Sequence, residues 1–116
     1  MAKSLSEFAQ FCLDMMQLLA PITAKAMFGG YGVYKNGVMF ALIANDILYL
    51  KTDEQNRAWF IEKQLAPFSY QKQGKTYTIA YYQCPEEAFD DEEVMLVWAK
   101  SAYLAAINSA AKKSIK

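Results

Sequence analysis

The sequence predicts an α+β fold, in which helices pack on an antiparallel sheet. Turn-forming pairs at residues 36–37 (Asn-Gly) and 45–46 (Asn-Asp) separate three apolar, strand-forming runs, and such pairs favour the tight turns of β-hairpins. A Gln-Gly pair at 73–74 separates two further runs of this kind. Apolar residues recur at helical spacing in the remaining segments. We therefore predict the order α-β-β-β-α-β-β-α, with two layers, a five-stranded antiparallel sheet and a single domain over residues 1–116.

The first predicted helix covers residues 4–20. Ser4 and Glu7 have the spacing of a capping box, in which two side chains satisfy backbone N–H groups of the first turn. Pro21 ends the helix, because the residue before a proline is disfavoured in the α conformation. The predicted apolar stripe of this helix consists of Leu5, Phe8, Cys12, Met15 and Leu19, widened by Phe11 and Leu18.

The segment from Lys25 to Ile43 is rich in glycine and aromatic residues. A phosphate-binding loop needs glycines spaced as in G-x-G-x-x-G, or the ending G-K-[ST], and this segment has neither. Gly29, Gly30 and Gly32 are therefore interpreted as structural glycines that permit a bulge, a kink or a close backbone approach. The strands predicted here form a meander over 31–35, 38–44 and 47–51.

A second helix is predicted over residues 53–65. The polar residues 52–54 (Thr-Asp-Glu) supply an N-terminal cap, and Pro67 ends the helix. Its predicted apolar side consists of Ala58, Trp59, Ile61 and Leu65. A second hairpin follows, with strands at 68–71 and 76–82. Alternation along the second strand places Tyr77, Ile79 and Tyr81 on one face.

Six of the eight residues from Glu86 to Glu93 are acidic. A metal-binding or partner-binding patch is one interpretation. Carboxylates also stabilise a helix N-terminus through the helix dipole, and a long run with helical spacing begins here, so we interpret the acids as the start of a C-terminal helix. One face of that helix is predicted to carry Val94, Val97, Trp98, Ser101, Ala102 and Ala105.

The composition argues against catalysis. The chain contains 12 Lys and Arg, 12 Asp and Glu, and no histidine. Without histidine there are no Ser-His or Cys-His nucleophile pairs and few ways to build a zinc site, so we expect no enzyme activity, no cofactor and no metal. Cys12 and Cys84 do not form a CxxC pair and are expected to be reduced structural residues, with a disulfide or redox role as the alternative.

The balanced charge lowers the expectation of nucleic-acid binding, since that binding relies on neutralising phosphates. The N-terminus has no apolar secretory segment. Charged residues interrupt the apolar runs before they reach the ~18 residues that a membrane helix needs. We therefore expect a cytoplasmic protein without a membrane segment.

The predicted strands 38–43 and 47–50 are apolar on both faces. A sheet covered by helices on one side only is expected to alternate apolar and polar residues. We therefore expect the second face to meet another subunit in a homodimer. The alternative is that the long C-terminal helix wraps round to cover it.

Three segments resemble the N-terminal domain of the TfoX/Sxy family. They are residues 24–34 (Ala-Lys-Ala-Met-Phe-Gly-Gly-Tyr-Gly-Val-Tyr), 37–43 (Gly-Val-Met-Phe-Ala-Leu-Ile) and 48–51 (Leu-Tyr-Leu-Lys). The similarity continues at Tyr81-Tyr82, Pro85 and Trp98-Ala99, and it extends from Leu5 to Ala106. The family often has arginine before Met-Phe, where this chain has Ala26 preceded by Lys25.

The resemblance implies an α+β fold close to that of small secretion chaperones. It also implies a regulatory role around natural competence, in transcription of DNA-uptake genes, through a co-regulator protein. Full-length members carry a second, helical C-terminal domain, so this chain is expected to be a stand-alone N-terminal domain. The family supplies no catalytic residues to carry over.

We predict a regulatory protein-binding module with a contact region in the glycine-aromatic segment. Core and bulge packing is the alternative role for the same side chains. The alternative functions are a small-molecule-binding domain and direct nucleic-acid binding, in which aromatic rings beside Lys25, Lys35 and Lys51 stack on bases. The predicted partner-binding residues are Lys25, Phe28, Tyr31 and Tyr34.

Overall fold

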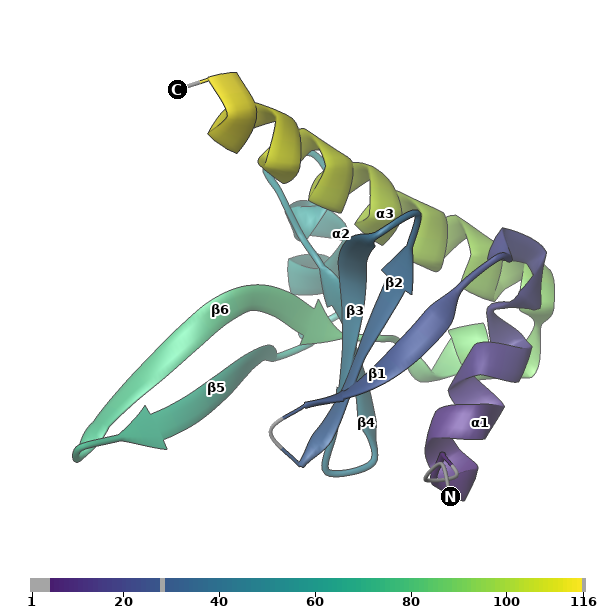
Figure 1. Cartoon of the computed structure of the whole chain (residues 1–116), viewed down its shortest axis with the longest axis horizontal. Helices are drawn as coiled ribbons and strands as arrows, with labels where there is room; N and C mark the ends of the chain where they lie inside the picture. The colour runs from purple at the N-terminus through teal and green to yellow at the C-terminus, as the bar shows by residue number, and fades with distance from the viewer. Residues whose placement is uncertain (1–4, 28, 116) are drawn as a thin grey trace.

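A computed structural model of the chain describes residues 5–27 and 29–115, with side chains through residue 111. Within these residues, six strands form one antiparallel sheet in the order β1-β2-β3-β4-β6-β5 (Figure 1). The predicted α+β class is confirmed, but the predicted count of five strands was wrong. The strands are β1 (Thr23–Met27), β2 (Gly30–Lys35), β3 (Val38–Ala44), β4 (Ile47–Lys51), β5 (Pro67–Lys72) and β6 (Lys75–Gln83).

The missed strand is β1, at one edge of the sheet. It pairs only with β2, with Lys25 opposite Gly32. Its sequence, Thr-Ala-Lys-Ala-Met, has one β-branched residue, Thr23, and no aromatic residue, and most of it is exposed. Pairing with the neighbouring strand therefore decides its conformation, and its own sequence pattern does not.

The predicted hairpin turns of the meander are present. Asn36 and Gly37 have φ angles of 51° and 78°, and Asn45 and Asp46 have φ angles of 53° and 59°. Positive φ at both central residues is what these two-residue turns require. A bulge between β2 and β3 leaves Phe40 as the extra residue, since Val33 pairs with Ala41 and Tyr34 pairs with Met39.

The N-terminal helix is shorter than predicted. Helix α1 (Glu7–Met15) is followed by a 3₁₀ turn, η1 (Gln17–Leu19). The Ser6 hydroxyl caps α1 by accepting from the Ala9 N–H at 3.1 Å, so the cap is not the predicted one; Ser4 lies outside the described residues. The buried residues of this segment are Ala9, Cys12, Met16 and Leu19.

Helix α2 (Arg57–Glu62) is also shorter than predicted, because the preceding residues form a separate turn. In that turn the Asp53 carboxylate accepts from the N–H groups of Gln55 and Asn56, at 2.9 and 3.3 Å. The predicted apolar side was wrong for Trp59 and Ile61, which are exposed, and it omitted Phe60, which is fully buried. The predicted Leu65 does pack against the core. A short helix has one inward position, and Phe60 occupies it.

The acidic run forms a 3₁₀ turn, η2 (Glu86–Asp90), and then the start of α3 (Glu92–Ile115). The Asp91 carboxylate accepts from the Glu93 N–H at 2.8 Å, which caps the helix. The predicted face is correct for Trp98, Ala102 and Ala105 but wrong for Val97, which points to solvent. The buried side of α3 consists of Met95, Trp98, Ala99, Ala102, Ala105 and Ala106.

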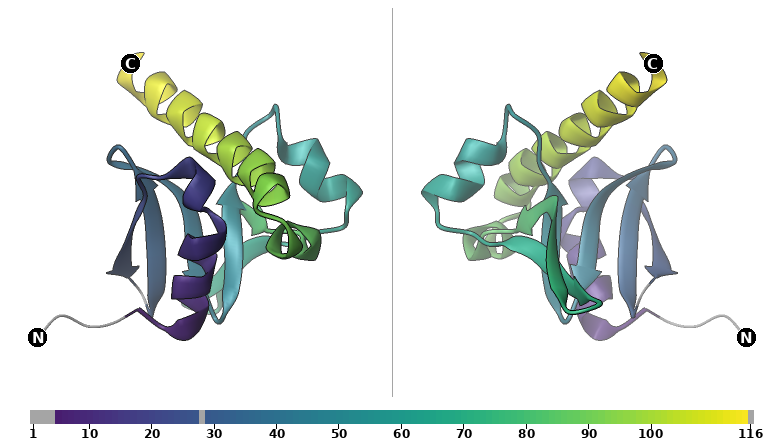
Figure 2. Two further views of the ribbon diagram at one scale, coloured as in Figure 1. Left: turned by 90° about the vertical axis from the view of Figure 1, so that its right-hand side faces the viewer. Right: turned by 90° about the vertical axis from the view of Figure 1, so that its left-hand side faces the viewer.

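The core lies between one face of the sheet and the helices, and α3 packs against β3 and β4 (Figure 2).

Residues Glu92–Ala111 of α3 have a mean hydropathy of 1.2 and are long and apolar enough to cross a membrane by length and composition alone. Lys100 lies within this stretch, so it is not an uninterrupted apolar run. One side of this helix belongs to the core of the fold, whereas Val97 and Leu104 on its other side are exposed.

Candidate functional site

The two faces of the sheet have different neighbours. On the face that packs against the helices, Val33, Ala41 and Leu50 are fully buried. Side chains alternate along a strand, so Lys25, Tyr34 and the residues paired across from them point the other way. We call this second side, which none of the described helices covers, the open face.

Two lysines lie over two tyrosine rings at the centre of the open face. Lys25 Nζ is 5.0 Å from the centroid of the Tyr34 ring, and Lys51 Nζ is 5.2 Å from that of Tyr81. These are cation–π distances. The Tyr81 hydroxyl donates a long hydrogen bond, 3.5 Å, to the Met39 carbonyl. Burial, and secondarily the neighbouring Tyr34, raises the pKa of Tyr81 to about 12, so this phenol stays protonated at neutral pH.

The glycines permit this packing. A Cβ on Gly32 would lie 2.8 Å from Met27 Sδ and 3.1 Å from Met39 Sδ, so these side chains close over the glycine. A Cβ on Gly30 would collide with the Ile43 carbonyl oxygen of the neighbouring strand. Gly29 has a φ of 79°, which favours glycine. The glycines therefore permit a close approach of neighbouring strands and side chains.

The structure divides the four predicted partner-binding residues. Lys25 and Tyr34 lie together on the open face. Tyr31 lies on the opposite side, packed against the core, where its hydroxyl accepts from the Ser6 N–H at 3.1 Å. Phe28 lies outside the described residues. Lys25 and Tyr34 therefore have Tyr81 as a neighbour on their face, and they do not share a surface with Tyr31.

Strands β5 and β6 form an arm that extends away from the body of the molecule (Figure 1). A row of aromatic rings continues from the sheet onto the arm. Successive ring centroids are 5.1 Å apart for Tyr49 and Phe68, 6.2 Å for Phe68 and Tyr70, and 5.5 Å for Tyr70 and Tyr77. Tyr70 and Tyr77 are 43% and 42% exposed. The arm thus presents flat aromatic surface to solvent.

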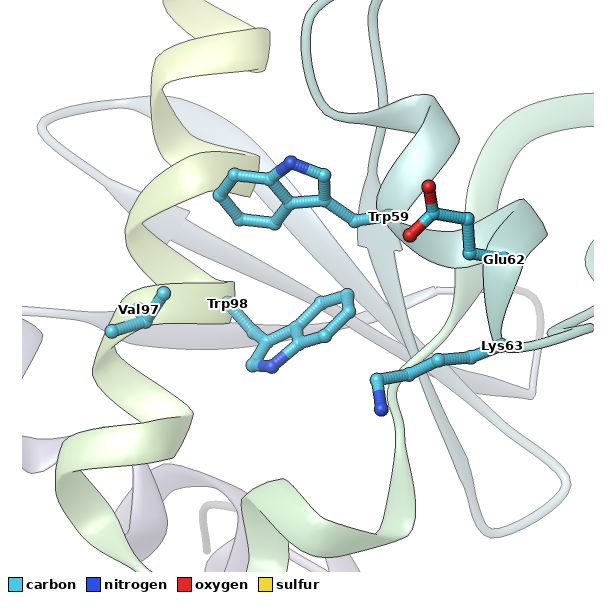
Figure 3. Close-up of a pocket in the computed structure, with 5 residues that line it drawn as sticks. All are labelled: Trp59, Glu62, Lys63, Val97 and Trp98. Carbon is cyan, nitrogen blue, oxygen red and sulfur yellow. The ribbon is translucent and has the colours of Figure 1, made fainter.

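A second candidate surface lies between α2 and α3. Trp59 separates two shallow hollows, which we call together the tryptophan groove. The larger hollow has a volume of about 540 Å³ (Figure 3), and the smaller has about 210 Å³. The larger is lined by Trp59, Glu62, Lys63, Val97 and Trp98. The smaller is lined by Asp53, Gln55, Asn56, Trp59, Ser101, Leu104, Ala105 and Asn108.

The apolar rim of the groove is exposed and rigidly supported. Trp59, Val97 and Leu104 are 42%, 55% and 50% exposed. The Trp59 ring meets the buried Trp98 ring edge to face, with centroids 5.6 Å apart. Trp98 in turn packs on Phe60 at 5.0 Å. The exposed tryptophan is therefore held in place by the core.

The polar groups around the groove are mostly paired with one another. Lys63 forms an ion pair with Glu87 at 3.0 Å, and the Asn108 amide donates to the Asp53 carboxylate at 3.2 Å. Glu62 has no ion-pair partner among the described residues. The groove therefore combines apolar side chains with one carboxylate available to a partner's cation.

The two thiols are not placed for chemistry. Cys12 and Cys84 are buried and unbonded to each other. Burial is the main cause that raises the pKa of Cys12 to about 12, with a smaller contribution from Asp46. Burial also raises the pKa of Cys84 far above its ordinary value. Because the thiolate is the nucleophilic form, both behave as small apolar side chains.

Within residues 5–27 and 29–111, His, Cys, Asp and Glu form no group that could hold a metal.

Sequence patterns missed both the tryptophan groove and the aromatic arm. The sequence pattern placed Trp59 on the buried side of its helix. Rotating the helix so that its neighbour Phe60 points inward was the alternative. Tyr70 and Tyr77 were placed in a hairpin, but their pairing opposite each other appears only with the strand register. The period-two alternation of β6 predicted a common face for Tyr77 and Tyr81, but it could not predict that Tyr70 lies opposite Tyr77.

Two comparisons with known proteins identify the family. Residues 14–106 match the TfoX N-terminal domain. The chain is also similar to Protein Sxy of Escherichia coli (strain K12), with 21% identity over 103 residues, which cover 89% of this chain and 49% of Sxy. The chain thus spans about half the length of this curated relative. Because the family match covers most of its length, the chain belongs to the TfoX N-terminal domain family.

Proposed function

We propose that this chain is a regulatory protein-binding module, related to regulators of natural competence, that acts on transcription of DNA-uptake genes through a co-regulator protein. Membership of the TfoX N-terminal domain family and similarity to Sxy support this role. In this proposal the chain works in the cytoplasm, without catalysis and without a cofactor. The homodimer expected from the sequence stays a prediction.

The tryptophan groove is the observation that carries the proposal. Binding energy at protein interfaces concentrates in a few residues, and tryptophan is enriched among them. Trp59 is 42% exposed, yet the contact with Trp98 holds its ring. A partner that covers this ring gains apolar burial and loses little side-chain freedom of the module. The groove therefore has the properties of a preorganised protein-binding site.

The chemistry of the groove suggests the features of the partner. Val97 and Leu104 flank Trp59 with apolar surface, so the partner presents a large apolar side chain that enters the hollow beside Trp98. Glu62 lines the same hollow and favours a lysine or arginine next to that side chain. A helix or loop of a transcription factor or of RNA polymerase that carries such a pair is the expected partner segment.

The test begins with affinity capture of the tagged chain from its own cells, with and without nuclease. The expected result is a transcription factor or RNA polymerase that stays bound after nuclease treatment. The identified protein is then purified, and its affinity for the chain is measured by calorimetry.

Trp59→Ala is compared with Phe11→Ala in that titration, because Phe11 is also 42% exposed but lies on α1. Trp59→Ala is expected to weaken binding by about 2 kcal/mol or more, which is about 30-fold. Phe11→Ala is expected to leave the affinity within twofold. Equal affinities of folded Trp59→Ala and wild-type protein would remove the groove from the interface.

A further inference from the structure

The charges of this neutral chain are unevenly distributed over the fold. The sequences of the six described strands contain five lysines and no aspartate or glutamate. The nearest acid in the chain order is Asp46, in the turn between β3 and β4. The other acids lie in the helices and in the connections that join the helices to the sheet. The net charge of the chain is zero, but the sheet is basic.

Four of the five lysines point to the open face. Lys25 and Lys51 lie over the rings of Tyr34 and Tyr81. Lys72 pairs with Lys75 beside the turn at the end of the arm, in the same alternation as Tyr70 and Tyr77. The fifth, Lys35, faces the helices, where its ammonium donates to the Leu19 carbonyl at 2.8 Å. The open face thus has cations at its centre and at the tip of the arm.

Aromatic rings lie between these cations. Tyr34 and Tyr81 occupy the centre of the face, and Tyr70 and Tyr77 lie on the arm (Figure 2, right, in which the arm is in front). Proteins that bind single strands combine a basic surface, which follows the phosphates, with exposed rings on which the bases stack. Both components are present on one continuous face.

We propose that the open face binds single-stranded nucleic acid. The exposed rings of Tyr70 and Tyr77 stack on bases, and Lys25, Lys51, Lys72 and Lys75 contact the phosphates. A duplex hides the faces of its bases, whereas a single strand exposes them, so the aromatic component of this surface selects the single strand. This site is separate from the tryptophan groove and uses none of its residues.

A second copy of the chain fits the same face less well. A twofold-symmetric contact places the same patch on both subunits. Across this face it would bring the lysines of one copy against those of the other, with no strand carboxylate to compensate, and like charges at an interface are unfavourable. The charge of the face is instead complementary to a polyanion.

The number of lysines predicts a salt dependence. Each phosphate contact on a single strand contributes about −0.7 to the slope of log K against log salt concentration. Four lysine contacts therefore predict a slope of about −2.8. Lys72→Ala with Lys75→Ala is expected to reduce the slope by about 1.4.

The experiment measures fluorescence anisotropy of a labelled 12-nucleotide oligo(dT), an oligo(U) of equal length and a duplex of equal length. The expected result is salt-dependent binding of the single strands, at least fivefold tighter than binding of the duplex. Tyr70→Ala with Tyr77→Ala is expected to weaken binding at least fivefold, and Lys72→Ala with Lys75→Ala at least tenfold at low salt. Circular dichroism checks that each variant is folded.

One control variant is matched to the lysine substitutions and one to the tyrosine substitutions. Lys100→Ala removes an exposed lysine on α3, and Phe11→Ala removes a ring as exposed as that of Tyr77; both are expected to bind as the wild type does. Trp59→Ala is also expected to bind the oligonucleotides normally, so loss of the protein partner and loss of nucleic-acid binding are distinguishable.

Results of three kinds would overturn the proposal. The first is no salt-dependent anisotropy change with either single strand. The second is a duplex bound as tightly as the single strands, or a loss in Lys100→Ala equal to that in the arm variants. The third is a doubled mass in sedimentation that Tyr70→Ala with Tyr77→Ala abolishes while oligonucleotides do not bind, since a second copy would then occupy the face.

Discussion

The two faces of this sheet are both rich in apolar and aromatic residues, but they are buried in different ways. On one face, Val33, Phe40 and Leu50 are fully covered by helices. On the open face, Leu42 and Tyr49 are only 7% and 8% exposed, although none of the described helices lies over them. Phe68 from the arm contacts Tyr49 there. A strand that is apolar on both sides thus requires cover, and the chain's own hairpin supplies part of it.

The largest expected difference between the faces is in stability. Phe40→Ala is expected to lower the free energy of unfolding by about 3–5 kcal/mol, because it empties a fully buried site. Tyr77→Ala, on the exposed arm, is expected to change it by less than about 0.5 kcal/mol. Urea denaturation measures both values. Similar losses in the two variants would mean that the arm is part of the cooperative core.

The next difference concerns two glycines on the same strand. Gly30→Ala is expected to cost about 2 kcal/mol or more, because the added Cβ meets the rigid Ile43 backbone. Gly32→Ala is expected to cost about 1 kcal/mol, since Met27 and Met39 can shift their flexible side chains. Denaturant midpoints of the two variants check this order. The reverse order would indicate that the methionine cover of the open face is the more rigid contact.

The third difference is a dependence of stability on pH. Cys12 has a pKa of about 12 in the folded chain against an ordinary 9.0, so below pH 9 its proton is bound in both the folded and unfolded states. As pH rises from 9 towards 12 the unfolded thiol loses its proton first, and folding becomes less favourable. Between pH 8 and pH 10 each buried thiol is expected to lower the free energy of unfolding by about 1.4 kcal/mol.

Urea denaturation of the reduced protein at pH 8 and pH 10 measures this loss. Cys12→Ala is less stable at both pH values because of its cavity, but its loss between them is expected to be smaller by about 1.4 kcal/mol. Tyr81, on the open face, has an ordinary pKa of 10.0, so it adds about 0.4 kcal/mol to the loss by pH 10 and more at higher pH. An unchanged loss in Cys12→Ala would contradict the burial of that thiol.

Sequence patterns correctly predicted the turns and the helix start that depend on residues close together in the chain. The turns at Asn36 and Asn45 need positive φ, which these residue types tolerate, and the hairpins formed where expected. The C-terminal helix began at the acidic run. The resemblance to the TfoX/Sxy family was confirmed by the family match. In each case the determining residues lie within a few positions of one another.

Features that depend on pairing across the chain could not be predicted in this way. Strand β1 exists because β2 lies beside it, and α2 takes its phase from the contact of Phe60 with Trp98. The basic character of the sheet could not be predicted for a similar reason. The net charge of the chain is zero, and only the fold shows that the strand lysines are separated from the acids.

The strands at the two edges of the sheet bear on how the protein behaves at high concentration. An open strand edge can pair with an edge of another molecule and begin aggregation. Edge strand β1 carries Lys25 at its centre, and edge strand β5 begins with Pro67 and ends with Lys72. Proline lacks a backbone donor, and lysines on approaching edges repel each other. The same lysines that make the open face basic therefore also oppose growth of the sheet into fibrils.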